Sequence, residues 1–120
     1  MSGVLRRFYA LIDGPDAAGY GELLSGDLRF SVLFSTGPGA ATDFAGGRPE
    51  FDAYMAQRGT PEWTHHVIAE STDGAVETVR GQTRQDGRTV ATFIAAVRVD
   101  GDGRIDRYLV GRSPAVVFDD

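Results

Sequence analysis

The chain has 120 residues, about the length of one domain, and its 42% hydrophobic and 24% charged residues are typical of a globular protein. Its net charge is -5, and no run of basic residues could follow a phosphate backbone, so we expect no nucleic-acid partner. The absence of Cys excludes disulfides, thiolate nucleophiles and Cys-ligated zinc.

Two further features bear on location and origin. The first residues lack the apolar stretch of a signal peptide, and no apolar run approaches the roughly eighteen residues of a membrane span. We therefore expect a cytoplasmic protein without a membrane partner. All twelve basic residues are Arg and 16 residues are Gly, which indicates a GC-rich, bacterial genome.

Two short helices are predicted at the start of the chain. The first begins after Ser2, a good N-cap, ends before Gly14 and places apolar residues at helical spacing: Val4, Leu5, Phe8, Leu11 and Ile12. The second begins after Asp16, ends at residues 25–26 and has one apolar face: Ala17, Tyr20, Leu23 and Leu24.

From Leu28 the apolar period changes to two, which predicts a strand with Leu28, Phe30, Val32 and Phe34 on one face. Residues 35–47 are rich in Gly and Ala, and we expect a loop over an opening, with at most a brief strand at residues 42–44. A third helix is predicted from Pro49 to Arg58, ended by Gly59.

Only strands are predicted after this helix, over residues 63–70, 75–84, 88–99 and 104–111. The segments between them contain Asp-Gly pairs, the chemistry of hairpin turns, so the four strands form a meander. No repeat or linker divides the chain, and residues 1–120 are one domain. The tail beyond Pro114 is expected to fray.

These elements predict an α+β fold, a cone-shaped half-barrel in which three N-terminal helices pack on the concave face of a curved, mainly antiparallel sheet. The wide end of such a cone stays open. It would form a pocket for an apolar small molecule held by a few polar contacts.

Both the element order and three local segments resemble the nuclear transport factor 2-like superfamily. The segments are residues 7–16 (RFYALIDGPD), 64–68 (THHVI) and 102–105 (DGRI). The nearest resemblance is to the SnoaL-like group, which includes polyketide cyclases and is related to ketosteroid isomerases, epoxide hydrolases and scytalone dehydratase. Fold alone does not choose among these activities.

The resemblance argues against two of those reactions. The Tyr acid and Asp base of ketosteroid isomerases fall on Phe8 and Val32, neither of which can transfer a proton. The Asp of the epoxide hydrolases' last strand falls on Val110, and their middle-strand Arg and Asp fall near Val79 and Gly81. Steroid isomerisation and epoxide opening by the familiar routes are therefore disfavoured.

Scytalone dehydratase matches better, since its Thr-x-His motif is similar to residues 64–66 and its helix-one Asp corresponds to Asp13, although its Tyr residues are replaced by Ile12 and Val32. We predict His66 as general base or acid, with Asp13 as its partner. The alternatives are a His66 hydrogen-bonded to the backbone and an Asp13 that stabilises a turn.

His65 and His66 point to opposite faces of a strand, so we expect no His-His metal site and no cofactor.

The predicted substrate-binding residues are Phe8, Val32, Tyr54 and Tyr108, although aromatic residues at such spacing more often belong to the hydrophobic core.

The sequence leaves three functions open. The first is an acid-base enzyme of the cyclase, isomerase or dehydratase type acting on an apolar cyclic metabolite. The second is a non-catalytic binding or sequestering protein for such a ligand, and the third is a dimeric scaffold with a vestigial pocket. Apolar residues on both faces of residues 88–99 predict a homodimer in each case.

Overall fold

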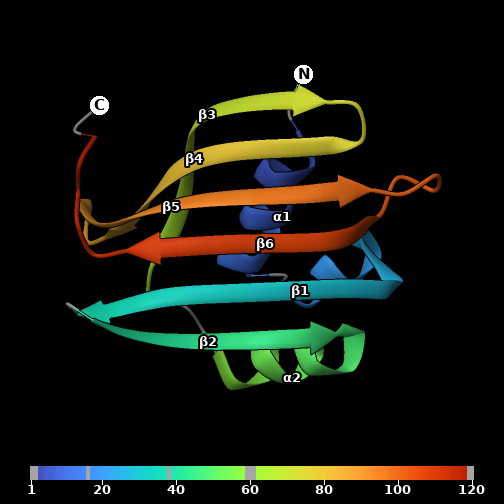
Figure 1. Ribbon diagram of the computed structural model, residues 1–120, viewed down its shortest axis with the longest axis horizontal. Coiled ribbons are helices and arrows are strands. Elements are labelled where there is room, and N and C mark those ends of the chain that lie inside the picture. The colour runs from blue at the N-terminus through green and yellow to red at the C-terminus, as the bar shows by residue number, and fades with distance from the viewer. Residues whose placement is uncertain (1–2, 16, 38, 59–61, 119–120) are drawn as a thin grey trace.

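The computed structural model describes residues 3–15, 17–37, 39–58 and 62–118. Its elements follow one another along the chain as helix α1, 3-10 helix η1, two strands, helix α2 and four strands (Figure 1). Their bounds are α1 Val4–Asp13, η1 Ala17–Leu23, β1 Leu24–Gly37, β2 Ala40–Gly47, α2 Arg48–Arg58, β3 Thr64–Asp73, β4 Val76–Gln85, β5 Arg88–Val99 and β6 Ile105–Ser113.

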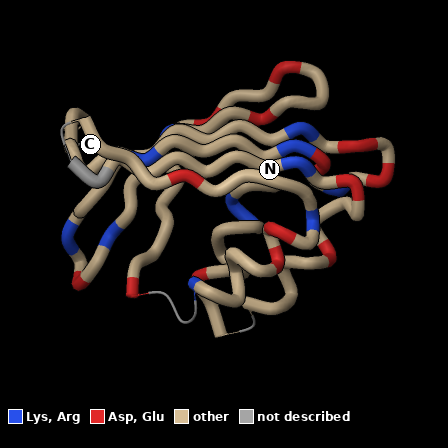
Figure 2. The backbone as a smooth tube through the Cα atoms, turned by 60° about the horizontal axis from the view of Figure 1, so that its bottom comes forward, with Lys and Arg blue, Asp and Glu red and all other residues tan. Residues whose placement is uncertain are grey.

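The strands form one six-stranded sheet in the order β2-β1-β6-β5-β4-β3. The pair β1/β6 is parallel and every other neighbouring pair is antiparallel, which confirms the meander predicted for the last four strands. The sheet is curved and unclosed, and the helices lie against one of its faces (Figure 2). The predicted α+β class with a curved, mainly antiparallel sheet is therefore confirmed.

The order of helices and strands needs two corrections. Two helices precede the sheet, but α2 follows β1 and β2, so the helices are not all N-terminal to it. The loop expected at residues 35–47 is wrong, because residues 40–47 form the edge strand β2. Pairing of β2 with β1, for example Val32 opposite Phe44, supplies the backbone hydrogen bonds that make a strand of this Gly- and Ala-rich segment.

The core lies between the helices and the covered face of the sheet. Residues of α1 such as Leu5 and Phe8, at 0% and 1% exposure, pack with strand residues that alternate with exposed ones. The strand residues of the covered face include Phe30, Val32, Val79, Phe93, Ala95, Val97, Tyr108 and Val110. The opposite face of the sheet exposes Leu33, Ile94 and Leu109.

The start of α1 is held by the sheet. Glu77 of β4 is buried, and its Oε2 and Oε1 accept hydrogen bonds from the backbone N–H groups of Val4 (3.1 Å) and Leu5 (2.9 Å). These are two of the N–H groups that a helix cannot satisfy internally. A Cβ at Gly3 would overlap the Glu77 carboxylate, so a larger residue there would displace it from these two N–H groups.

Gly3 precedes α1 and has no side chain to cap it, so the described contact at this helix start is the one from Glu77. The predicted N-caps Ser2 and Asp16 and the predicted terminator Gly59 lie outside the described residues. The longest helix in the described ranges, α2, has 11 residues, about half of what a bilayer-spanning helix needs.

Candidate functional site

An open cavity of about 540 Å³ lies where the C-terminal end of α2, the start of β3 and the ends of β1 and β6 meet. Its volume falls in the range of small-molecule sites, roughly 300–1,000 Å³. The lining residues are Phe34, Phe44, Tyr54, Gln57, Arg58, Glu62, Trp63, His65 and Arg112. A narrow inner extension of about 30 Å³ continues between the helices and the sheet.

At the cavity wall, Asp13 and His65 form a close pair. Asp13 is the last residue of α1, and its Oδ2 accepts a hydrogen bond from the backbone N–H of His65 at 2.6 Å. The His65 Nδ1 lies 2.9 Å from Oδ1 and 3.2 Å from Oδ2 of the same carboxylate. An ionised carboxylate only accepts, so Nδ1 carries the proton, and Nε2 of a neutral ring keeps its lone pair.

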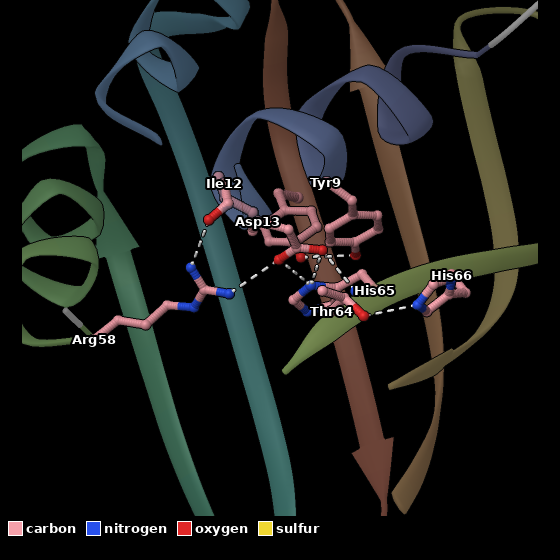
Figure 3. A network of polar contacts seen from close by, with 8 residues as sticks. Tyr9, Ile12, Asp13, Arg58, Thr64, His65 and His66 are labelled. Atoms are coloured by element: carbon pink, nitrogen blue, oxygen red, sulfur yellow. Dashed lines mark hydrogen bonds and ion pairs between the residues drawn. The ribbon is translucent and has the colours of Figure 1, made fainter. Parts of the chain in front are cut away.

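Arg58 completes this group from the end of α2 (Figure 3). Its Nη2 donates to Asp13 Oδ1 at 3.3 Å, and its Nη1 donates to the backbone carbonyl of Ile12 at 3.2 Å, so it also satisfies the end of α1. Burial opposes ionisation of Asp13, but the hydrogen bonds from His65 and the charge of Arg58 outweigh it and lower the Asp13 pKa. Asp13 is therefore an anion at neutral pH.

The buried Tyr9 stacks on the His65 ring and is itself hydrogen-bonded to a second buried tyrosine, Tyr108. The Tyr9 ring is stacked on His65, with 4.5 Å between the centroids and 9° between the planes. The Tyr9 and Tyr108 hydroxyls are hydrogen-bonded to each other at 2.9 Å. Burial raises the pKa of both tyrosines, so both stay protonated. The hydrogen bonds to Asp13 and the stacked Tyr9 ring together restrain the orientation of the imidazole.

His66 lies apart from this group, as Figure 3 shows. Its Nε2 is 2.7 Å from Thr64 Oγ1, and it does not line the cavity or its inner extension. Burial, with a smaller contribution from the charge of Arg84, lowers the His66 pKa. The predicted pairing of Asp13 with His66 is therefore wrong: alternation along β3 turns His65 toward α1, and the partner of Asp13 is His65.

The structure places all four predicted substrate-binding residues, Phe8, Val32, Tyr54 and Tyr108, around the inner extension. Phe8 and Val32 are each 1% exposed and form its floor. Tyr54 also lines the outer cavity, and burial raises its pKa. The contact of these residues with a ligand stays a prediction.

Sequence reasoning missed Arg112. In the parallel pair β1/β6 this residue lies opposite Phe34, so both side chains share the covered face. Its guanidinium carbon is 3.9 Å from the Phe34 ring centroid and 4.4 Å from that of Trp63. Burial lowers the Arg112 pKa. No periodic signal marks such a residue, because the pairing of β1 with β6 is a long-range event.

Within the described residues, no group of three or more His, Asp or Glu side chains could hold a metal ion. The polar groups that line the cavity are the His65 imidazole, two guanidinium groups, the Glu62 carboxylate, the Gln57 amide and the Tyr54 hydroxyl, and its walls are largely aromatic.

Comparison with known proteins shows the fold. No family model and no curated protein matches the sequence. Among solved structures, a proposed SnoaL-like isomerase from Agrobacterium tumefaciens superposes with a TM-score of 0.69 at 15% identity, covering 91% of this chain and 93% of that one. A proposed ketosteroid isomerase from Kribbella flavida gives 0.70 at 17% identity, with 98% and 80% covered.

A third similar structure is IdmH, a proposed polyketide cyclase from Streptomyces antibioticus, with a TM-score of 0.65 at 19% identity and 91% and 88% covered. Other similar structures are described as nuclear transport factor 2-like proteins of unknown function. The chain has the nuclear transport factor 2-like fold, as its sequence resemblance implied, and its structural neighbours include SnoaL-like proteins.

Proposed function

We propose that the protein is an acid-base enzyme acting on a cyclic, largely apolar small molecule, with His65 as the proton-transferring residue and Asp13 as the residue that orients it. The observation that carries the proposal is the Asp13–His65 pair at the wall of an open cavity, with Nδ1 bonded and Nε2 left as acceptor. A positioned imidazole of this kind contributes to catalysis by proton transfer.

The reaction class follows from what one imidazole can do. Nε2 removes a proton from carbon next to a substrate carbonyl, which gives an enolate and an imidazolium stabilised by Asp13. The imidazolium then returns the proton to another carbon, which isomerises the substrate, or to a departing hydroxyl, which leaves as water. If the enolate attacks a second carbonyl, a ring closes and the proton goes to the new alkoxide. The proposed polyketide cyclase and isomerases among the structural neighbours support this class.

The test compares His65→Ala with His66→Ala, two adjacent residues on opposite faces of β3. Steroids, terpenoid epoxides and aromatic polyketides are screened by thermal shift, and each hit is analysed by mass for conversion. We expect wild type and His66→Ala to convert a hit that His65→Ala only binds. Loss of conversion in His66→Ala alone would return the assignment to His66, the residue predicted from the sequence.

A non-catalytic binding protein is the second candidate, and a specific observation favours it. The positions where ketosteroid isomerases carry their acid and base hold Phe8 and Val32, which here are buried floor residues. This candidate predicts hits that wild type, His65→Ala and His66→Ala bind without converting.

We also propose a homodimer formed through the sheet face opposite the helices, beside the C-terminal residues Val117 and Phe118. Leu33, Ile94 and Leu109 are 49%, 59% and 59% exposed on the neighbouring strands β1, β5 and β6, around Gly111, which has no side chain. An apolar patch of this kind is typical of an interface. Light scattering should give twice the chain mass for wild type and one chain mass for Ile94→Glu. A monomeric wild type at high micromolar concentration would refute both the dimer and the scaffold function. A cytoplasmic location stays a prediction.

A further inference from the structure

The charged residues that line the cavity include more arginines than carboxylates. Its outer part is lined by Arg58, Arg112 and one carboxylate, Glu62. Glu62 is exposed and accepts a hydrogen bond from Gln85 at 3.2 Å. The inner extension is lined by both arginines, and no Asp or Glu is among its described lining residues. Asp13, just behind this lining, forms an ion pair with Arg58.

The two arginines differ in what they already bind. Arg58 donates to Asp13 and to the Ile12 carbonyl, so its charge is balanced by a carboxylate. Arg112 has no hydrogen bond or ion pair within the described part of the chain; its contacts are the two aromatic rings, Phe34 and Trp63. A cation-π contact does not use up the N–H donors of a guanidinium as a hydrogen bond to an oxygen acceptor does, so these donors are available to a ligand.

A half-buried guanidinium without a carboxylate partner destabilises the folded protein. Burial removes part of its hydration, and no acceptor among the described residues replaces the lost hydrogen bonds to water. Its contacts with both rings restrain the group, so less conformational freedom is lost when it binds a planar anion. The carboxylate group fits this arrangement best, since its two oxygens match the parallel N–H bonds of a guanidinium. One free guanidinium with Glu62 nearby also favours a monoanion over a phosphate dianion.

We propose that the ligand of this cavity is a cyclic carboxylate, whose carboxylate group binds Arg112 while its ring lies among Phe44, Tyr54 and His65. This inference rests on the proposed function, because it concerns the same cavity, and it narrows the substrate class from an apolar ring to an apolar ring with one acidic group. Arg112 is then the residue that selects the ligand by charge, and His65 is the residue that acts on it.

The experiment uses two probes of equal shape, 2-naphthoate and 2-naphthamide, titrated calorimetrically into the full chain. Charge-assisted hydrogen bonds contribute about 1.5–3 kcal/mol, so we expect wild type to bind the carboxylate roughly 10- to 100-fold more tightly than the amide. Arg112→Gln should remove this preference and leave amide binding nearly unchanged. Arg104→Gln, which changes an exposed arginine outside the cavity lining, should keep the preference.

A second variant of Arg112 controls for loss of folding in Arg112→Gln. Arg112→Lys keeps the charge but lacks the planar fork, and we expect a carboxylate preference between those of wild type and Arg112→Gln. The inference is overturned if wild type does not prefer the carboxylate, if the preference survives in Arg112→Gln, or if neither probe binds at millimolar concentration.

The proposed acid-base function is tested separately, by conversion in His65→Ala. Turnover that depends on His65 without charge selection refutes only the carboxylate inference, whereas charge selection without turnover refutes only the acid-base function.

Discussion

Replacing Glu77 by Gln should destabilise the whole protein, because this side chain joins the sheet to the start of α1. Glu77 is 7% exposed and accepts two hydrogen bonds from helix N–H groups. A hydrogen bond to a charged group contributes about 1.5–3 kcal/mol, and a neutral one about 1 kcal/mol. Gln keeps one neutral acceptor and turns the other into a donor that faces an N–H group. It also loses the attraction between a carboxylate and the helix N-terminus. The expected loss is about 2–3 kcal/mol.

The assay is urea unfolding followed by circular dichroism at pH 7, with Glu70→Gln as the matched control. Glu70 also joins a strand to α1, through an ion pair with Arg6 at 3.3 Å, but both side chains are partly exposed. Removing such a surface pair costs about 0–1 kcal/mol. If Glu77→Gln lost no more stability than Glu70→Gln, the capping role of Glu77 would be refuted.

Three further predictions concern the residues behind the cavity. Because the folded pKa of Asp13 lies below its ordinary 3.8, the ionised form contributes stability that is lost as pH falls through that lowered pKa, and pH-dependent unfolding of Asp13→Asn should lack this loss. Tyr9→Phe should cost about 1–3 kcal/mol by leaving the Tyr108 hydroxyl buried alone, and the double variant with Tyr108→Phe should cost less than the sum of the single ones in a double-mutant cycle. Gly81→Ala should lower the melting temperature, with a cost of about 1–3 kcal/mol, because its Cβ would overlap the Phe93 ring; unchanged melting would contradict the close contact.

In the candidate site, the sequence motif identified the right segment but the wrong histidine as the partner of Asp13. Residues 64–66 are similar to a Thr-x-His motif, and Asp13 matches the helix-one Asp of the same enzyme. From this resemblance the sequence correctly predicted that the two segments lie close together. Which histidine faces Asp13 depends on the parity of β3, and a shift of one residue exchanges the two faces of a strand. The backbone hydrogen bond from His65 to Asp13 fixes that parity, and it joins residues 52 positions apart.

Local signals in the sequence determined most of the architecture. Apolar spacing identified α1, α2, β1 and the four strands β3 to β6, and Asp-Gly pairs identified the turns of the meander, because each signal is contained in a few neighbouring residues. The tertiary structure alone decided the rest: that residues 40–47 become an edge strand, that Glu77 caps α1, that His65 rather than His66 meets Asp13, and that Arg112 contacts the rings of Phe34 and Trp63. Each of these depends on strand register or on contact between distant segments, which side-chain periodicity does not encode.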